Sequence, residues 1–391
     1  MICLFLERIF EKRKGLILTF LNLSAVSSSF GLLFITAIVS DKENLVKISA
    51  FLAITAPLLA VTSLKLRDYL LTEKVPQELQ NSILSISILT TPISFFAVLL
   101  FIQHSLEVKT SLILALGGWR ITENLRDLTG IYFFIKDKFA KAILCTFASH
   151  ISLGAYIISL FFGSTMEFAF ILALCISLLI TLTFLTPEIP NIFINFGPKK
   201  ILGDLKILLK FSFILCFVNS IYLWIFNSPR IYAMKFTDSS DAAPITFAYL
   251  FLIPISIVVS SVVLGKLHSD KRDNLNHLSK YTLTLTATIL SLHYLTSHLH
   301  SSQHTAFTSL LWITAYSPFI LISIIGTQLV FKKYIREQVV ILSFAALLVY
   351  LTHQNLDLSS KSLASAHLII NLFILITYNF AYNNRSKKCK Q

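Results

Sequence analysis

The chain has 391 residues, of which 55% are hydrophobic and 14% carry a formal charge, and its mean hydropathy is +0.74. A soluble globular protein cannot hide so many apolar side chains from water, so this composition excludes one and predicts an all-α integral membrane protein. The net charge of +13 would suggest nucleic acid in a soluble protein. Here the loops account for it, and no nucleic-acid partner is implied.

Apolar stretches of about 20 residues recur along the chain with short polar breaks between them, and each is long enough to cross roughly 30 Å of hydrocarbon as a helix. We count about twelve such stretches, which leaves no room for a soluble domain. The predicted spans cover residues 15–39, 46–70, 80–102, 109–135, 140–162, 167–187, 206–229, 243–265, 279–299, 305–331, 337–354 and 363–382.

The first span begins within residues 1–20 ("MICLFLERIFEKRKGLILTF"), a stretch that could be mistaken for a signal peptide because basic residues precede an apolar run. It has no convincing small-residue cleavage site and many spans follow it, so we expect it to remain attached on the cytoplasmic side. Within this span, residues 24–31 ("SAVSSSFG") are small and mostly polar. Close helix packing is the usual role of such residues, and lining a central cavity is the alternative.

The second span ends in "LKLRDYLLTEK", residues 64–74. Lys65 and Arg67 fit two interpretations equally well: side chains that extend toward lipid headgroups, or part of a binding site. Asp68 lies beside Arg67, and an acidic residue at the membrane edge is not what topology alone would select. We therefore keep Arg67 and Asp68 as candidate binding residues.

The fourth span contains "GWRITENLRDLTG", residues 118–130, which places four charges inside an apolar stretch. At 100° per residue these charges and Asn124 share one helix face, an arc of about 160°. Each mid-span Arg or Asp costs roughly 2.5 to 3.5 kcal/mol to insert, so four unpaired charges would cost on the order of 10 kcal/mol. We expect this face to be shielded from lipid. The charged residues are Arg120, Glu123, Arg126 and Asp127.

Two interpretations of this face remain open. The charges could satisfy one another and only fix helix packing, since Arg120 and Glu123 have the i,i+3 spacing of a helical ion pair. Alternatively they could line a water-filled cavity, which we favour because ionisable groups inside membranes are functional by default.

The connection between the sixth and seventh spans, residues 187–206, concentrates Pro, Gly and Lys. It predicts an N-terminal six-helix lobe over residues 1–190, a cytoplasmic linker over 191–205 and a C-terminal six-helix lobe over 206–391. Six plus six helices with both termini on one side is typical of two parallel repeats related by an axis along the membrane normal.

The seventh span ends in "NSIYLWIFNSPR", residues 219–230. The more common interpretation is an interfacial aromatic belt and a helix that stops before Pro229. The functional alternative is an outward-facing polar rim, in which Tyr222 and Trp224 stack on sugars and Arg230 holds an anion.

Other motifs do not indicate catalysis. His298, His300 and His304 lie in one loop with no acid or Cys beside them, so a solvated loop is favoured over a metal site. We find no P-loop, no H-E-x-x-H, no G-x-S-x-G and no kinase signature. We therefore expect neither enzymatic activity nor a bound metal or other cofactor, apart from protons or sodium as coupling ions.

The distribution of basic residues over the loops predicts the orientation. If the N-terminus is cytoplasmic and the number of spans is even, Lys and Arg on the cytoplasmic side outnumber those on the opposite side by about four to one. Only Arg120 and Arg126 then remain inside a span. We expect a multi-pass protein with both termini in the cytoplasm.

With these stretches in place, the chain resembles the polysaccharide flippases, the O-antigen translocase group. Their superfamily also contains the multidrug and toxic-compound exporters. The resemblance covers the full length as a pattern. It is most specific in "LKLRDYLLTEK", in "WRITENLRDLTGIYFFIKDKFAKAILCTFAS" and in "NSPRIYAMKF" followed by "FAYLFLIPIS".

The resemblance implies two six-helix lobes that alternate between inward-open and outward-open states in a bacterial inner membrane. The implied cargo is an undecaprenyl-pyrophosphate-linked oligosaccharide, such as an O-antigen unit of lipopolysaccharide, and the implied partners are membrane lipids, a glycan polymerase and glycosyltransferases. Its charged cavity residues carry over to Arg67, Asp68, Arg120, Glu123, Arg126, Asp127 and Arg230.

Combined with the residue chemistry, this predicts that Arg120 and Arg126 hold the pyrophosphate while Glu123 and Asp127 orient them or bind a coupling cation. An ion-coupled exporter of small molecules on the same fold is one alternative. A membrane scaffold for glycan-assembly enzymes, without transport, is another.

Overall fold

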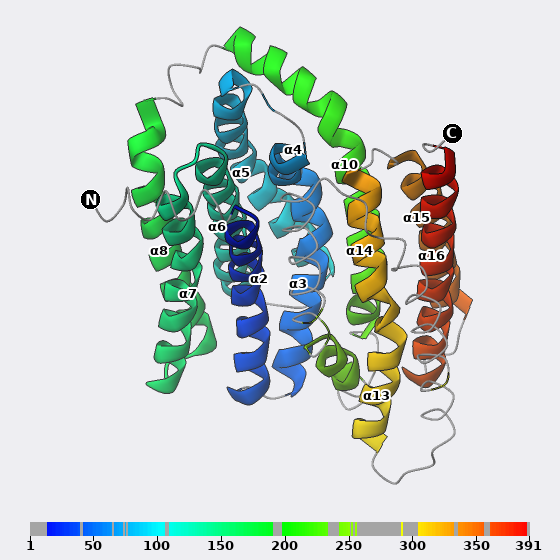
Figure 1. Ribbon diagram of the computed structural model, residues 1–391. Coiled ribbons are helices and arrows are strands. Elements are labelled where there is room, and N and C mark those ends of the chain that lie inside the picture. Colours follow the sequence, from blue (N-terminus) through cyan, green and yellow to red (C-terminus); the bar gives the residue numbers. More distant parts are fainter. Residues whose placement is uncertain are drawn as a thin grey trace. The chain divides into compact units, whose positions relative to one another are not determined.

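The computed structural model describes residues 14–39, 42–64, 66–72, 75, 77–105, 109–190, 198–233, 242–250, 252, 255, 291, 304–331, 335–355 and 360–388. Every regular element in this part of the chain is helical (Figure 1), which confirms the predicted all-α fold. The side chain of Asp68 lies outside the described residues, although its backbone is part of a short helix.

The chain forms two compact units. Unit 1 comprises residues 1–35 and 55–220, and unit 2 comprises residues 36–54 and 221–391. The first seven helices of the described chain are α2 (Lys14–Val39), α3 (Lys42–Thr62), α4 (Leu66–Thr72), α5 (Gln77–Ser105), α6 (Thr110–Ile135), α7 (Phe139–Phe161) and α8 (Met166–Leu185). They are followed by η1 (Thr186–Glu188), α10 (Pro198–Ala233), α13 (His304–Tyr316), α14 (Pro318–Phe331), α15 (Ile335–Asn355) and α16 (Ser360–Lys388).

Seven helices in the described residues are long and apolar enough to cross a membrane. They contain the segments 43–62, 79–103, 139–161, 166–188, 212–233, 335–354 and 360–382. Helix α6 has 26 residues but carries the four charges of the predicted polar face, and it is not among these seven segments.

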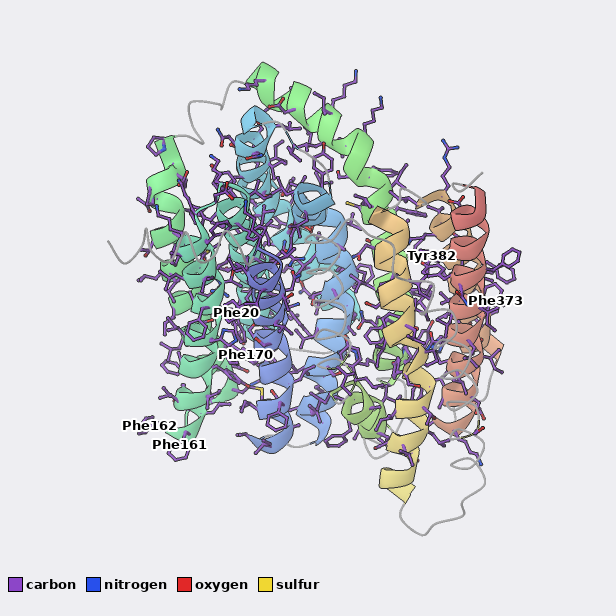
Figure 2. All side chains as sticks on the ribbon, viewed as in Figure 1. Phe20, Phe161, Phe162, Phe170, Phe373 and Tyr382 are labelled. Carbon is purple, nitrogen blue, oxygen red and sulfur yellow. The ribbon has the colours of Figure 1, made fainter. Side chains whose placement is uncertain are left out.

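Large apolar side chains also cover the outside of these helices. Phe161 at the end of α7 is 87% exposed and Phe162 follows it; Figure 2 shows both projecting away from the helix, whereas Phe170 on α8 is buried. Exposed rings of this size are unfavourable in water but favourable in lipid. The helices and their surfaces together indicate a multi-pass membrane protein.

The predicted second span, residues 46–70, is wrong as a single helix. Helix α3 ends at Thr62, a turn follows in which Leu64 has a φ of 52°, and α4 begins at Leu66. The apolar pattern continues through α4 because Leu66 and Tyr69 pack into the core of unit 1. Hydropathy alone cannot separate residues that face lipid from residues that face the protein interior.

The predicted span over residues 305–331 is also divided. Helix α13 ends at Tyr316, Ser317 forms a turn, and Pro318 is the first residue of α14. Proline lacks a backbone N–H and fits the first turn of a helix, so this position is a natural helix start. Most of the predicted spans 243–265 and 279–299 and the predicted linker residues 191–197 lie outside the described residues.

The core of unit 1 depends on close contact between α6 and α7. A Cβ atom added to Gly130 would lie 2.4 Å from Oγ1 of Thr146 on α7. That hydroxyl is buried and donates to the carbonyl of Ala142 at 3.0 Å, so rotating it away would lose a hydrogen bond. Small residues permit such close approach between membrane helices.

We predict that Gly130→Ala destabilises unit 1. The double variant Gly130→Ala with Thr146→Ala should have a stability close to that of the parent protein. Overpacking costs about 1–3 kcal/mol, which exceeds the gain of about 1 kcal/mol that Ala has over Gly in a helix. The midpoint of thermal unfolding of the purified protein in detergent measures the effect. Gly154→Ala on α7 is the matched control, because an added Cβ there meets nothing within 4 Å. Equal unfolding midpoints for Gly130→Ala and Gly154→Ala would show that the close approach at Gly130 does not limit the size of its side chain.

Candidate functional site

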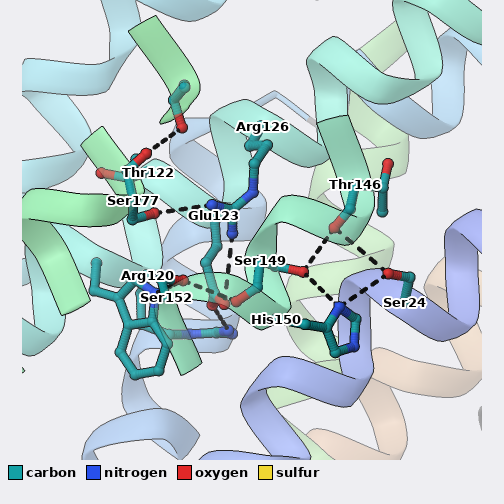
Figure 3. A network of polar contacts seen from close by, with 12 residues as sticks. Ser24, Arg120, Thr122, Glu123, Arg126, Thr146, Ser149, His150, Ser152 and Ser177 are labelled. Atoms are coloured by element: carbon teal, nitrogen blue, oxygen red, sulfur yellow. Dashed lines mark hydrogen bonds and ion pairs between the residues drawn. The ribbon is translucent and has the colours of Figure 1, made fainter. Parts of the chain in front are cut away.

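The charged face of α6 lies inside unit 1, where α6 packs against α5, α7 and α8. Its charges are ion-paired rather than isolated. Arg120 Nη1 donates to Glu123 Oε2 at 2.9 Å, which is the i,i+3 pair expected from the spacing. Arg126 approaches the other oxygen of the same carboxylate, with Nη2 at 3.9 Å from Oε1 (Figure 3). One buried carboxylate therefore lies between two guanidinium groups.

The two arginines differ in their surroundings. Arg126 is buried, and its Nη1 donates to the hydroxyl of Ser177 on α8 at 3.0 Å. Arg120 keeps 19% of its side-chain surface exposed. The structure therefore places Arg126 between helices, whereas Arg120 retains part of its side-chain surface.

A second ion pair connects α4 to α6. Arg67 Nε lies 2.7 Å from Asp127 Oδ2, and the side chains keep 24% and 20% of their surface exposed. Arg67 also donates through Nη2 to the side-chain oxygen of Asn22 on α2. This pair brings α2, α4 and α6 together, and it joins residues from two motifs that lie far apart in the sequence.

These two groups together form what we call the unit 1 charge cluster: Arg67, Arg120, Glu123, Arg126 and Asp127. Among the described side chains of this cluster, three arginines face two carboxylates.

Arg230 belongs to the other unit and is buried there. Its guanidinium stacks on Tyr249, with Cζ 3.4 Å from the ring centroid, and it donates to the side-chain oxygen of Asn227. The same oxygen accepts a hydrogen bond of 3.2 Å from the Tyr249 hydroxyl. The predicted helix stop before Pro229 is wrong, because α10 continues through this proline to Ala233. Tyr222 stacks on Phe319 of α14 at 4.5 Å.

Sequence reasoning did not single out His150, which lies midway along α7. Its Nε2 is 2.7 Å from the hydroxyl of Ser27. Its Nδ1 is 3.4 Å from the hydroxyl of Ser24 (Figure 3). Two serines of the first span thus form a polar contact between α2 and α7. The available signal was a single ionisable residue at the centre of an apolar span.

A polar cluster at the other end of α6 was also missed. The ammonium of Lys136 donates to Asn81 at 2.7 Å and to the Tyr132 hydroxyl. Glu188 is buried and accepts from Lys138 at 3.1 Å. Burial lowers the pKa of the Lys136 ammonium, although the carboxylate of Glu188 counteracts this shift. The cluster joins the beginning of α5, the end of α6 and η1.

Unit 2 contains a buried pair of histidines. The Nε2 atoms of His353 on α15 and His367 on α16 are 3.1 Å apart, and His353 stacks on Tyr232. No group of three or more metal-ligating side chains occurs in the described part of the chain. The predicted histidine loop lies outside the described residues, which include neither His298 nor His300 nor the side chain of His304.

Comparison with known proteins gives a match in structure only. No family model matches the chain, and no curated protein matches its sequence.

The chain is similar to an outward-facing multidrug resistance MATE family transporter of the MOP superfamily, with 12% identity, a TM-score of 0.57 and coverage of 97% of this chain and 96% of that one. The inward-facing conformation of such a transporter matches with 12% identity, a TM-score of 0.56 and 96% coverage of both chains.

A MOP superfamily transporter from Pyrococcus furiosus, described as having a binding pocket of reverse polarity that suggests a different function, matches with 13% identity and a TM-score of 0.58, covering 97% of this chain and 96% of that one. At such identities the comparison establishes the architecture. The chain has the fold of the MATE transporters of the MOP superfamily, as the family resemblance implied.

Proposed function

We propose that this chain is a transporter that works by alternating access and carries an anionic, lipid-linked oligosaccharide across the membrane. The cargo class is an oligosaccharide on undecaprenyl pyrophosphate. Its glycan and pyrophosphate cannot cross roughly 30 Å of hydrocarbon unaided, whereas its polyprenyl tail can stay in lipid.

The fold supports the transport part of this proposal. Proteins with this fold are described in both outward-facing and inward-facing conformations. A protein with two such states transports when the cargo binds them unequally, because only a difference in affinity shifts their populations.

Two partly exposed guanidinium groups in the unit 1 charge cluster support an anionic cargo. Glu123 is already shared by two arginines, and Asp127 pairs with Arg67. Arg120 and Arg67 combine partial exposure with a guanidinium group, the side chain best suited to bind phosphate through paired hydrogen bonds. We assign pyrophosphate binding to Arg120 and Arg67, and a positioning role to the buried Arg126.

A second candidate is an ion-coupled exporter of lipophilic cations. Its support is that the carboxylates of Glu123 and Asp127 lie in the same cluster, and that two of the similar structures are multidrug transporters. The Pyrococcus furiosus protein is described by the reverse polarity of its pocket. Pocket charge is therefore the property to test.

We predict that Arg120→Gln lowers the rate of oligosaccharide translocation at least tenfold, while Arg120→Lys keeps a larger part of it. Loss of a charge-assisted hydrogen bond costs about 1.5–3 kcal/mol, or about 10- to 100-fold in affinity. The assay follows a fluorescent lipid-linked oligosaccharide in vesicles that contain equal amounts of each variant.

The matched control is Lys109→Gln, which removes one positive charge at the start of the same helix, where the lysine pairs with Glu167 at 2.9 Å. We expect it to transport like the parent. Efflux of a lipophilic cation from the same vesicles tests the second candidate. If Arg120→Gln increases cation efflux and leaves oligosaccharide translocation unchanged, the exporter replaces the flippase.

Arg126 should behave differently, because it is buried. We predict that Arg126→Met lowers the free energy of unfolding by about 3 kcal/mol, the lower end for a broken buried ion pair, since Glu123 keeps Arg120. Arg126→Lys should recover part of this loss, because it restores a positive charge beside Glu123. Thermal unfolding in detergent measures both. An Arg126→Met protein as stable as the parent, with transport lost, would instead place Arg126 in contact with cargo.

A further inference from the structure

The first part of α10 is more polar than the rest of that helix. The segment that is long and apolar enough to cross a membrane covers residues 212–233, and the helix begins at Pro198, so about four turns precede this segment. This part belongs to unit 1. Figure 1 shows the beginning of α10 running obliquely over the end of unit 1 where α5 begins.

One face of this segment packs on the protein. Leu208 is fully buried in the core of unit 1, and Ile201 and Leu205 pack against the same core. Ser82 at the beginning of α5 donates to the carboxylate of Asp204. These contacts fix the rotation of the helix about its axis, and so they decide which residues face outward.

The opposite face is a stripe of two lysines followed by two phenylalanines. Lys206, Lys210, Phe213 and Phe217 have the spacing i, i+4, i+7, i+11 and fall within an arc of about 60°, centred opposite Leu208. Both lysines are exposed. Phe213 is 63% exposed and Phe217 is 45% exposed. We call these four residues the α10 stripe.

The stripe changes from charged to apolar where the membrane span begins. With a rise of about 1.5 Å per residue, Lys210 and Lys206 lie about 3 and 9 Å before the start of the span. The headgroup layer extends about 5–8 Å beyond the hydrocarbon on each side, so both ammonium groups can reach it. Phe213 and Phe217 lie within the span.

This order of charge and apolar surface matches one amphiphilic molecule. Two lysines at i,i+4 repel each other and weaken an isolated helix, and a phosphate between them removes that repulsion. An acyl chain attached to the phosphate would then pass along the two rings. We propose that the α10 stripe binds an anionic phospholipid, with its phosphate between Lys206 and Lys210 and an acyl chain on Phe213 and Phe217. This inference does not depend on the cargo proposed above.

The test titrates the full-length protein in detergent with phosphatidylglycerol or phosphatidylcholine and measures bound lipid by native mass spectrometry. Near an anionic headgroup each lysine contributes about fivefold in affinity, so Lys206→Gln with Lys210→Gln should weaken phosphatidylglycerol binding about 25-fold. Binding of phosphatidylcholine should stay the same. Phe213→Ala with Phe217→Ala should weaken both lipids by similar factors and keep the preference for phosphatidylglycerol.

Lys109→Gln with Lys361→Gln is the matched control, because it removes two exposed lysines from the side of the membrane predicted to be opposite. It should bind both lipids like the parent. Unchanged phosphatidylglycerol binding in the Lys206/Lys210 variant would overturn the proposal, as would an equal loss in the control. Full competition by inorganic phosphate would also overturn it, since a soluble anion would then occupy the surface without any acyl chain.

Discussion

A charge inside a membrane must have a partner, and this requirement organises unit 1. Helix α6 meets it by sharing the carboxylate of Glu123 between two arginines and by pairing Asp127 with Arg67 of another helix. Breaking either pair would leave a charge in a medium of low dielectric constant, where it costs several kcal/mol. The Arg67–Asp127 pair thus joins α4 to α6, and hydrogen bonds from Arg67 to Asn22 and from Arg126 to Ser177 connect the same arginines to α2 and α8.

Hydropathy was sufficient to predict the all-α fold and the positions of most described helices, because the length and composition of each span follow from the thickness of the bilayer. Hydropathy was not sufficient to locate the positions at which one helix ends and the next begins within an apolar stretch. The turn at Leu64 and the start of α14 at Pro318 lie inside apolar stretches. Conversely, Pro229 was expected to end a helix that continues through it, since neighbouring helices can compensate for the lost hydrogen bond of a proline in a membrane.

The site could be predicted in part. Helical periodicity placed the charges of α6 on one face, and the Arg120–Glu123 pair follows from their spacing. Periodicity fixes the direction of a side chain but not its neighbour. Nothing in the sequence indicated that Arg126 meets Ser177, that Arg67 meets Asp127, or that His150 meets two serines of the first span. Each of these contacts joins residues at least 50 positions apart.

The boundary between the two units crosses three helices instead of three loops: it falls after residue 35 in α2, after 54 in α3 and after 220 in α10. A helix resists bending because its backbone hydrogen bonds form a continuous ladder, so each of these three connections is stiffer than a loop would be. Only α3 has a proline close to its crossing, Pro57, and proline removes one rung of the ladder. Of the three helices that cross the boundary, α3 is thus the one whose ladder of hydrogen bonds is interrupted nearest to its crossing.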